Sequence, residues 1–255
     1  MNALIDSPFV VFTVAVLGLS LSARIGAAVA RRRRNLDELV REDFGVVQGA
    51  TLTLLDLIIG FSFSMAISRY DQRRQLEAAE ANAIGTEYVR ADLLPAGDAA
   101  RVRALLRRYL DQRVLFYTAR NAQQLRQVNA DTAKVQADLW SSVQAPAAAH
   151  PTPMVALAVA GMNDVLNSQA YTQAAWWNRI PAAAWGLMAA IAISCNLLMG
   201  YGARKAKAES VLLLVLPVLV SVSFLLIADI DSPRGGVIRV SPQNLDSLVQ
   251  SLAAQ

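Results

Sequence analysis

Residues 60–70 have the sequence GFSFSMAISRY and close an apolar stretch, 46–68, that is long enough to cross a bilayer. An α-helix over this stretch rises about 34 Å, slightly more than a hydrocarbon core about 30 Å thick. Polar residues such as Gln48, Thr53 and Asp56 interrupt it, and a helix surrounded wholly by lipid has little use for them. Function is therefore expected to lie in this stretch.

The rest of the chain repeats the apolar pattern. Hydrophobic residues make up 55% of the 255 residues, and charged residues make up 17%. The charges fall mostly outside the apolar windows, as in a polytopic membrane protein. We predict an all-α membrane protein with four transmembrane helices and a helical extramembrane domain between the second and third. The windows are 8–30, 46–68, 181–201 and 209–228.

These windows divide the chain into four parts. The predicted parts are two transmembrane helices with a short arginine-rich loop, an extramembrane helical domain, two further transmembrane helices, and a C-terminal tail. In that order they cover 1–68, 69–180, 181–228 and 229–255.

The middle domain has the pattern of a helical bundle. The periodicity of the second helix continues to Leu94 and stops at the Pro-Ala-Gly sequence of 95–97. Asp98 is the expected N-cap of the next helix, whose apolar stripe begins at Val102. That stripe needs a partner helix, which we expect in 154–178, after prolines at 146, 151 and 153 break the intervening chain.

The chain lacks the residues that several classes of function require. The one cysteine, Cys195, lies in the third window, and the one histidine, His150, lies in an Ala/Pro-rich loop. Neither has the partners of a metal or catalytic site, and the chain has no phosphate-binding glycine loop. The sequence pI of about 9.5 rests largely on arginines beside the windows. We therefore expect no enzyme, cofactor, metal site or nucleic-acid partner.

Charge gives a modest preference for one topology. Four crossings place loops 31–45 and 202–208 on one side of the membrane, with eight Lys and Arg residues against six near the membrane on the other. The positive-inside rule then makes the loops cytoplasmic and the helical domain external. The arginine run 31–34 is best explained as a topology anchor, with a contact to anionic lipid or an anion-attracting vestibule as alternatives.

One face of the second helix has the composition of a pore lining. Thr53, Leu57 and Phe61 follow one another at steps of four residues, and Ser64 and Ser68 continue the same face. If several copies of the helix surround an axis, this face forms an apolar constriction followed by hydroxyls. Bulky apolar rings gate by dewetting, and hydroxyls can replace part of an ion's hydration shell.

Two charged residues are candidates for selectivity or gating. Asp56 lies about 100° around the helix from Leu57, and an ionisable group inside a bilayer is a functional hypothesis by default. It could pair with an arginine, take up a proton, face the lumen, or make a protonated or hydrogen-bonded contact between helices. A ring of ionised carboxylates would favour cations. Arg69 lies at the membrane boundary.

The second helix resembles a known pore helix. The sequence LIIGF at 57–61, followed by SRY at 68–70, resembles the second transmembrane helix of the bestrophins, where a Phe-x-x-Gly-Phe neck precedes an arginine and an aromatic residue. The whole chain resembles bacterial bestrophin-like membrane proteins of unknown function. The shared pieces are GFSFSMA at 60–66, SRYD at 68–71, EANAIGT at 80–86, LLP at 93–95 and DIDSPRGG at 229–236.

This resemblance implies a homo-oligomer, pentameric in the bestrophins, in a bacterial inner membrane, with its neck at Thr53, Leu57 and Phe61. Leu57 stands where bestrophins have an aromatic residue and Thr53 where they have an aliphatic one, so the neck would be wider and more polar. Their acidic calcium site has no counterpart. Bestrophins also keep their termini and extramembrane domain in the cytosol, the reverse of the charge-based topology.

Two functions follow from these patterns. The first is an oligomeric ion channel that passes small anions such as chloride through a pore lined by the second helix. The alternative is a non-conducting membrane scaffold or sensor whose helical domain binds a partner.

Overall fold

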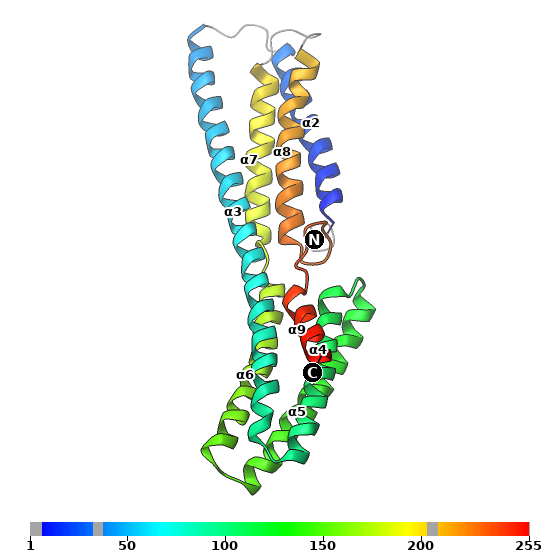
Figure 1. Cartoon of the computed structure of the whole chain (residues 1–255). Coiled ribbons are helices and arrows are strands. Elements are labelled where there is room, and N and C mark those ends of the chain that lie inside the picture. The colour runs from blue at the N-terminus through cyan, green and yellow to red at the C-terminus, as the bar shows by residue number, and fades with distance from the viewer. Residues whose placement is uncertain (1–6, 33–37, 203–208, 255) are drawn as a thin grey trace. The chain divides into compact units, whose positions relative to one another are not determined.

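A computed structural model describes residues 7–32, 38–202 and 209–254, with side chains from 43 and from 213 onward after the two internal gaps. Every regular element in these residues is a helix (Figure 1). This confirms the all-α fold predicted from the sequence.

The chain divides into two compact units. Unit 1 comprises Met1–Tyr70 and Arg179–Arg239, and unit 2 comprises Asp71–Asn178 and Val240–Gln255. The predicted C-terminal tail, 229–255, is therefore shared between the two units rather than forming a segment of its own.

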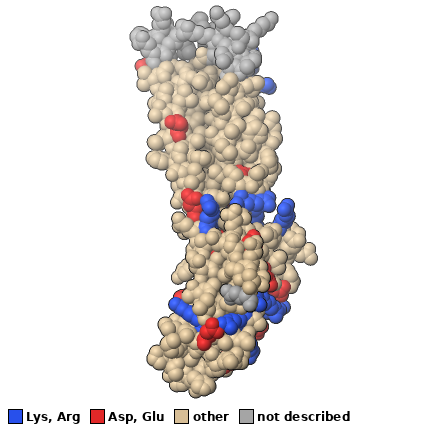
Figure 2. Space-filling view, viewed as in Figure 1, with Lys and Arg blue, Asp and Glu red and all other residues tan. Residues whose placement is uncertain are grey.

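Unit 1 holds the membrane helices. It contains α2 (Pro8–Arg32), α7 (Ala182–Gly202), α8 (Glu209–Asp231) and the part of α3 (Glu38–Arg90) that ends at Tyr70. On the face shown in Figure 2, this unit carries few charged residues along most of its length. Within the described residues, four helical ranges are long and apolar enough to cross a membrane, and each overlaps a predicted window. They are Pro8–Arg32, Asp43–Leu93, Pro153–Gly202 and Leu213–Asp231.

Helices α2 and α7 pack backbone against backbone. A Cβ added to Gly200 of α7 would collide with the carbonyl oxygen of Ala23, and one added to Gly26 of α2 would collide with that of Leu197. Ser22 Oγ donates a hydrogen bond to the Ile193 carbonyl oxygen at 2.7 Å. Small residues allow this close approach, which membrane helices use in place of a hydrophobic driving force.

The core of unit 1 lies between α7, α8 and one side of α3. Met188, Ala192 and Cys195 of α7 are buried against Phe224 and Ile227 of α8. From α3, the buried side chains in this cluster are Leu55 and Ala66.

Unit 2 is a helical bundle. It contains the end of α3, a 3-10 turn (Ala91–Leu93) and four further helices. Helix α4 packs on α5, and α5 packs on α6. The four helices are α4 (Ala96–Thr118), α5 (Ala122–Ala149), α6 (Pro153–Trp177) and α9 (Gln243–Ala253).

Two local predictions for this bundle were wrong, and a third was incomplete. The N-cap of α4 is Pro95, and Asp98 instead lies in the first turn, where a negative charge suits the helix dipole. Helix α4 does contact the predicted helix in 154–178, since the ring centroids of Phe116 and Trp176 lie 4.9 Å apart, but it also packs on α5, which was not predicted. Pro146 was taken as a break, but it lies inside α5.

The contact between α2 and α7 can be tested with a single methyl group. We expect Gly200→Ala to lower the apparent melting temperature of the purified protein by several degrees, because the backbone of α2 must move to admit the Cβ. Gly186→Ala is the matched control, since no described atom lies within 4 Å of its added Cβ in the same helix. Equal melting temperatures for the two variants would contradict this packing.

Candidate functional site

The predicted pore residues share the uncovered side of α3. Thr53, Leu57, Phe61, Ser64 and Ser68 are all exposed in the single chain, with Leu57 52% and Phe61 60% exposed. This group is called the outer face below.

The opposite side of α3 is packed within the chain. Leu55, Ser62 and Ala66 are buried, and at 100° per residue they lie about 160° around the helix from the outer face. The outer face is thus left for lipid, another copy of the chain, or a lumen.

Hydroxyl groups on the outer face present different hydrogen-bonding chemistry. Thr53 Oγ1 donates to the Gly49 carbonyl oxygen at 3.0 Å, so only its lone pairs point outward. Within the described residues, Ser64 and Ser68 have no hydrogen bond from their hydroxyls. Their protons are free to bind an anion, whereas the Thr53 oxygen is suited to a cation.

Asp56 lies between the two sides of α3. It is exposed and lies about 100° around the helix from both the outer face and the buried side. No ion pair joins it to another described residue.

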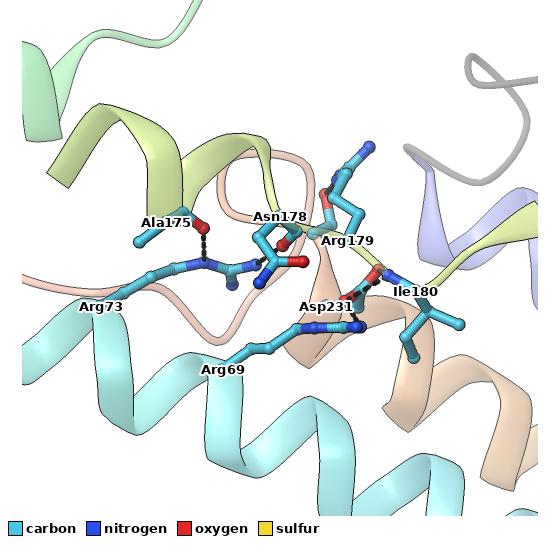
Figure 3. A network of polar contacts seen from close by, with 8 residues as sticks. Arg69, Arg73, Ala175, Asn178, Arg179, Ile180 and Asp231 are labelled. Carbon is cyan, nitrogen blue, oxygen red and sulfur yellow. Dashed lines mark hydrogen bonds and ion pairs between the residues drawn. The ribbon is translucent and has the colours of Figure 1, made fainter. Parts of the chain in front are cut away.

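Arg69 lies in a polar network at the end of the membrane helices (Figure 3). Arg69 Nη1 forms an ion pair with Asp231 Oδ1 at 3.3 Å. The backbone N–H of Ile180 donates to both carboxylate oxygens of Asp231, at 3.2 and 3.1 Å. Because Asp231 is only 1% exposed, this network joins α3, the segment before α7, and the end of α8 through one buried carboxylate.

Asp229 fixes the chain that leaves α8. Its carboxylate accepts hydrogen bonds from the backbone N–H groups of Val237 and Ile238, at 2.7 and 2.8 Å. Gly236 lies so close that an added Cβ would fall 2.6 Å from the carboxylate oxygen Oδ1. The DIDSPRGG sequence thus forms a compact turn in which both aspartates hold backbone groups.

In unit 2, Arg73 is 1% exposed and caps the end of α6. Its Nε donates to the Ala175 carbonyl oxygen and its Nη2 to that of Asn178, both at 3.4 Å (Figure 3). Cationic groups at this end of a helix satisfy its free carbonyls and complement its dipole.

Glu80 forms the central ion pair of unit 2. Its Oε1 lies 2.5 Å from Arg113 Nε, and both side chains are fully buried. The hydroxyls of Tyr117 and Thr172 donate to Oε2, at 3.5 and 3.3 Å. Although burial alone would lower the pKa of the Arg113 guanidinium, the charge of Glu80 raises it overall.

Sequence reasoning missed Arg113, although a signal was available. Arg113 continues the stripe of Val102, Leu106 and Tyr109 at helical spacing, so the pattern predicts that it lies on the same buried side of the helix. A buried arginine needs a carboxylate partner.

Glu77 caps the N-terminus of α9 from another helix. Its Oε1 accepts from the backbone N–H groups of Asn244 and Leu245, at 2.9 and 3.0 Å. Its Oε2 accepts from Asn244 Nδ2 at 2.6 Å. This bond network attaches the C-terminal helix to α3.

Comparison with known proteins identifies the family. The model of the bestrophin-like domain matches residues 11–245. The chain belongs to the bestrophin-like family. No match was found among curated proteins.

Solved structures show that the bestrophin-like fold extends over nearly the whole chain. A variant of a bacterial bestrophin homologue from Klebsiella pneumoniae is similar with a TM-score of 0.65 and 13% identity, covering 94% of this chain and 96% of that one. A second variant gives 0.64 and 14%, covering 97% and 99%. A further structure of the homologue gives 0.62 and 16%, covering 95% and 94%.

The bestrophin-like chain also buries one carboxyl group without a hydrogen bond. Glu87 of α3 is fully buried, and neither of its carboxyl oxygens has a partner among the described residues. Gly161 of α6 makes room for it, because an added Cβ would collide with Oε2. Burial raises the pKa of Glu87 to about 8; Arg90 opposes this increase and Asp164 adds to it.

This carboxyl group should make stability depend on pH. Because its pKa is higher in the folded protein than its ordinary value of 4.5, the folded state holds the proton more tightly. The free energy of unfolding should therefore fall as pH rises from about 4.5 to about 8, by at most about 1.4 kcal/mol per pH unit.

Glu87→Gln should flatten this dependence and make the protein more stable than wild type above pH 8. Melting temperatures measured across that pH range would check it. The exposed Asp111 provides the control, since Asp111→Asn should keep the wild-type slope. An unchanged slope in Glu87→Gln would contradict a buried neutral carboxyl.

Proposed function

We propose that the protein is an oligomeric ion channel in which copies of α3 surround a pore, with the outer face turned toward the axis. The observation that carries this proposal is the division of α3 into two sides. One side packs on the unit's own core, and the other exposes bulky apolar groups and hydroxyls. Membership of the bestrophin-like family supports the same reading.

In this arrangement Leu57 and Phe61 form the constriction. The two residues are one helical turn apart, about 6 Å along the axis, so copies of each would form two stacked apolar rings. Such rings exclude water when narrow and close the pore by dewetting. Widening them by a small rotation of α3 would admit hydrated ions.

We further propose that the pore passes small anions, such as chloride. Ser64 and Ser68 have hydroxyl protons available, and these would replace part of an anion's hydration shell. Asp56 would oppose anions if it were ionised at the axis. Its place at the flank of the outer face instead suits a contact with the neighbouring copy of α3.

For Arg69 we propose a supporting role in gating. Its ion pair with Asp231 holds α3 against the end of α8, so its charge is largely neutralised in this state. Loss of the pair would both free α3 to rotate and expose a positive charge at the end of the pore. A homo-oligomer, possibly a pentamer, in a bacterial inner membrane is the form that we propose for the channel.

A non-conducting scaffold is the second candidate. The exposed apolar groups at Leu57 and Phe61 would serve equally well as a packed contact between copies of the chain. In that case the oligomer would have no continuous lumen.

Currents from the purified protein reconstituted in planar bilayers would test the channel. We expect wild-type currents that reverse near the anion potential, and a several-fold larger conductance for Phe61→Ala because the apolar ring is widened. The matched control is Phe63→Ala, which alters the same residue type about 160° around the same helix.

Absence of current from both wild type and Phe61→Ala under any ionic gradient would refute the channel and favour the scaffold. Reversal near the cation potential would replace anion with cation selectivity. An equal gain of conductance in Phe63→Ala would place the lumen on another side of α3.

A further inference from the structure

A pocket of about 410 Å³ lies between α2 and α8 in unit 1. Two arginines of α2, Arg24 and Arg31, line it together with the hydroxyl-bearing Ser20. Its other lining residues are small or apolar: Ala23, Ala27, Ala28, Leu213 and Leu214. The pocket thus combines two positive charges with an apolar wall.

Arg24 lies within the predicted span 8–30. Counting at 1.5 Å per residue, it is about 10 Å along α2 from Arg31, nearer the middle of the bilayer. Arg24 and Arg31 are seven residues apart, which is close to two full turns, so both side chains extend from the same side of α2. An arginine at this depth is costly unless it has a partner or extends to the polar boundary of the membrane.

The described residues give these arginines no counter-charge. Neither Arg24 nor Arg31 has an ion pair with a described side chain, and the pocket lining contains no carboxylate. Unit 1 does provide partners for positive charge elsewhere, as at Asp231. No described side chain therefore neutralises the charge in this pocket, and a ligand could do so.

Ser20 supplies an independent observation. Its Oγ is buried and has no hydrogen-bond partner among the described residues, yet it belongs to the lining of this pocket. A buried hydroxyl without a partner is unfavourable, and a ligand oxygen would satisfy it. Ser20 lies one turn from Arg24, so one oxyanion can reach both groups.

We propose that this pocket binds the phosphate group of an anionic membrane lipid. Arg24 and Ser20 hold the phosphate oxygens, Arg31 holds the polar side of the headgroup, and an acyl chain lies along Leu213 and Leu214. The planar guanidinium fork matches two phosphate oxygens at once, which favours Arg over Lys. The apolar wall favours a lipid over free phosphate. This site is separate from the outer face of α3 and does not depend on channel function.

Lipid titration of the purified full-length protein, followed by native mass spectrometry, tests the site. The probes are phosphatidylglycerol, zwitterionic phosphatidylcholine and inorganic phosphate. We expect wild type to retain phosphatidylglycerol preferentially, and Arg24→Gln to bind it about tenfold more weakly. Arg24→Lys should recover only part of this binding, because the charge is kept but the fork is lost.

Arg32→Gln is the matched control, since Arg32 is exposed at the end of the same helix and does not line the pocket. It should bind phosphatidylglycerol as wild type does. If Arg24→Gln fails to fold, Arg31→Gln takes its place, with weaker binding again expected.

Three results would overturn the proposal. The first is equal retention of the two lipids by wild type, and the second is an equal effect of the Arg24 and Arg32 substitutions. The third is binding of inorganic phosphate as tight as that of phosphatidylglycerol, which would make a soluble anion the ligand.

Discussion

The packing of one side of α3 constrains what the other side can do. Leu55, Ser62 and Ala66 are buried in the chain's own unit, so a rigid helix must direct Leu57 and Phe61 away from it. The exposed stripe is therefore a consequence of internal packing, rather than a feature that could be turned inward by changing rotamers. Whatever surrounds the protein has to accommodate two large apolar groups and three hydroxyls at this place.

Buried carboxylates hold side chains and helix ends in place in both units. Asp231 holds Arg69 and the backbone of Ile180, and Asp229 holds the turn after α8. In unit 2, Glu80 and Glu77 bind a guanidinium and a helix N-terminus. Each of these four carboxylates has a structural partner within its own unit. Three of them, Glu80, Asp229 and Asp231, lie in the sequence pieces that carried the family resemblance, and folding contacts explain them.

Local patterns in the sequence were enough for the apolar helices and for the grouping of residues on one side of α3, but they did not predict α5 or α9. Apolar windows have the length and composition of spans, and steps of four residues place side chains on one face of a helix. Partners distant in sequence were beyond this reasoning. The spacing of charges along α3 gives no sign of the partner of Glu80, because Arg113 is in α4 and only tertiary packing brings the two together. Pro146 misled because a helix held by its neighbours can tolerate a proline.

For the candidate pore face as well, the sequence pattern describes one helix and not the contacts between copies of the chain. Periodicity grouped its five residues, and their exposure in the folded chain is consistent with that grouping. A lumen, however, requires several copies of the helix, and no pattern within one chain fixes how many copies meet or which ion they pass.

The glycine contact between α2 and α7 has a consequence for biosynthesis. Ser22 and Ile193, which are hydrogen-bonded across it, are separated by 171 positions in the sequence. At a translation rate of roughly 5 to 20 residues per second, α2 is made about 10 to 30 seconds before its partner. During that interval its small-residue face, with Gly26 and Ser22, lacks α7 and can contact lipid, the membrane insertion machinery or the newly made α3. Helix α2 must therefore wait in the bilayer, and assembly of unit 1 is completed only after α7 and α8 have been made.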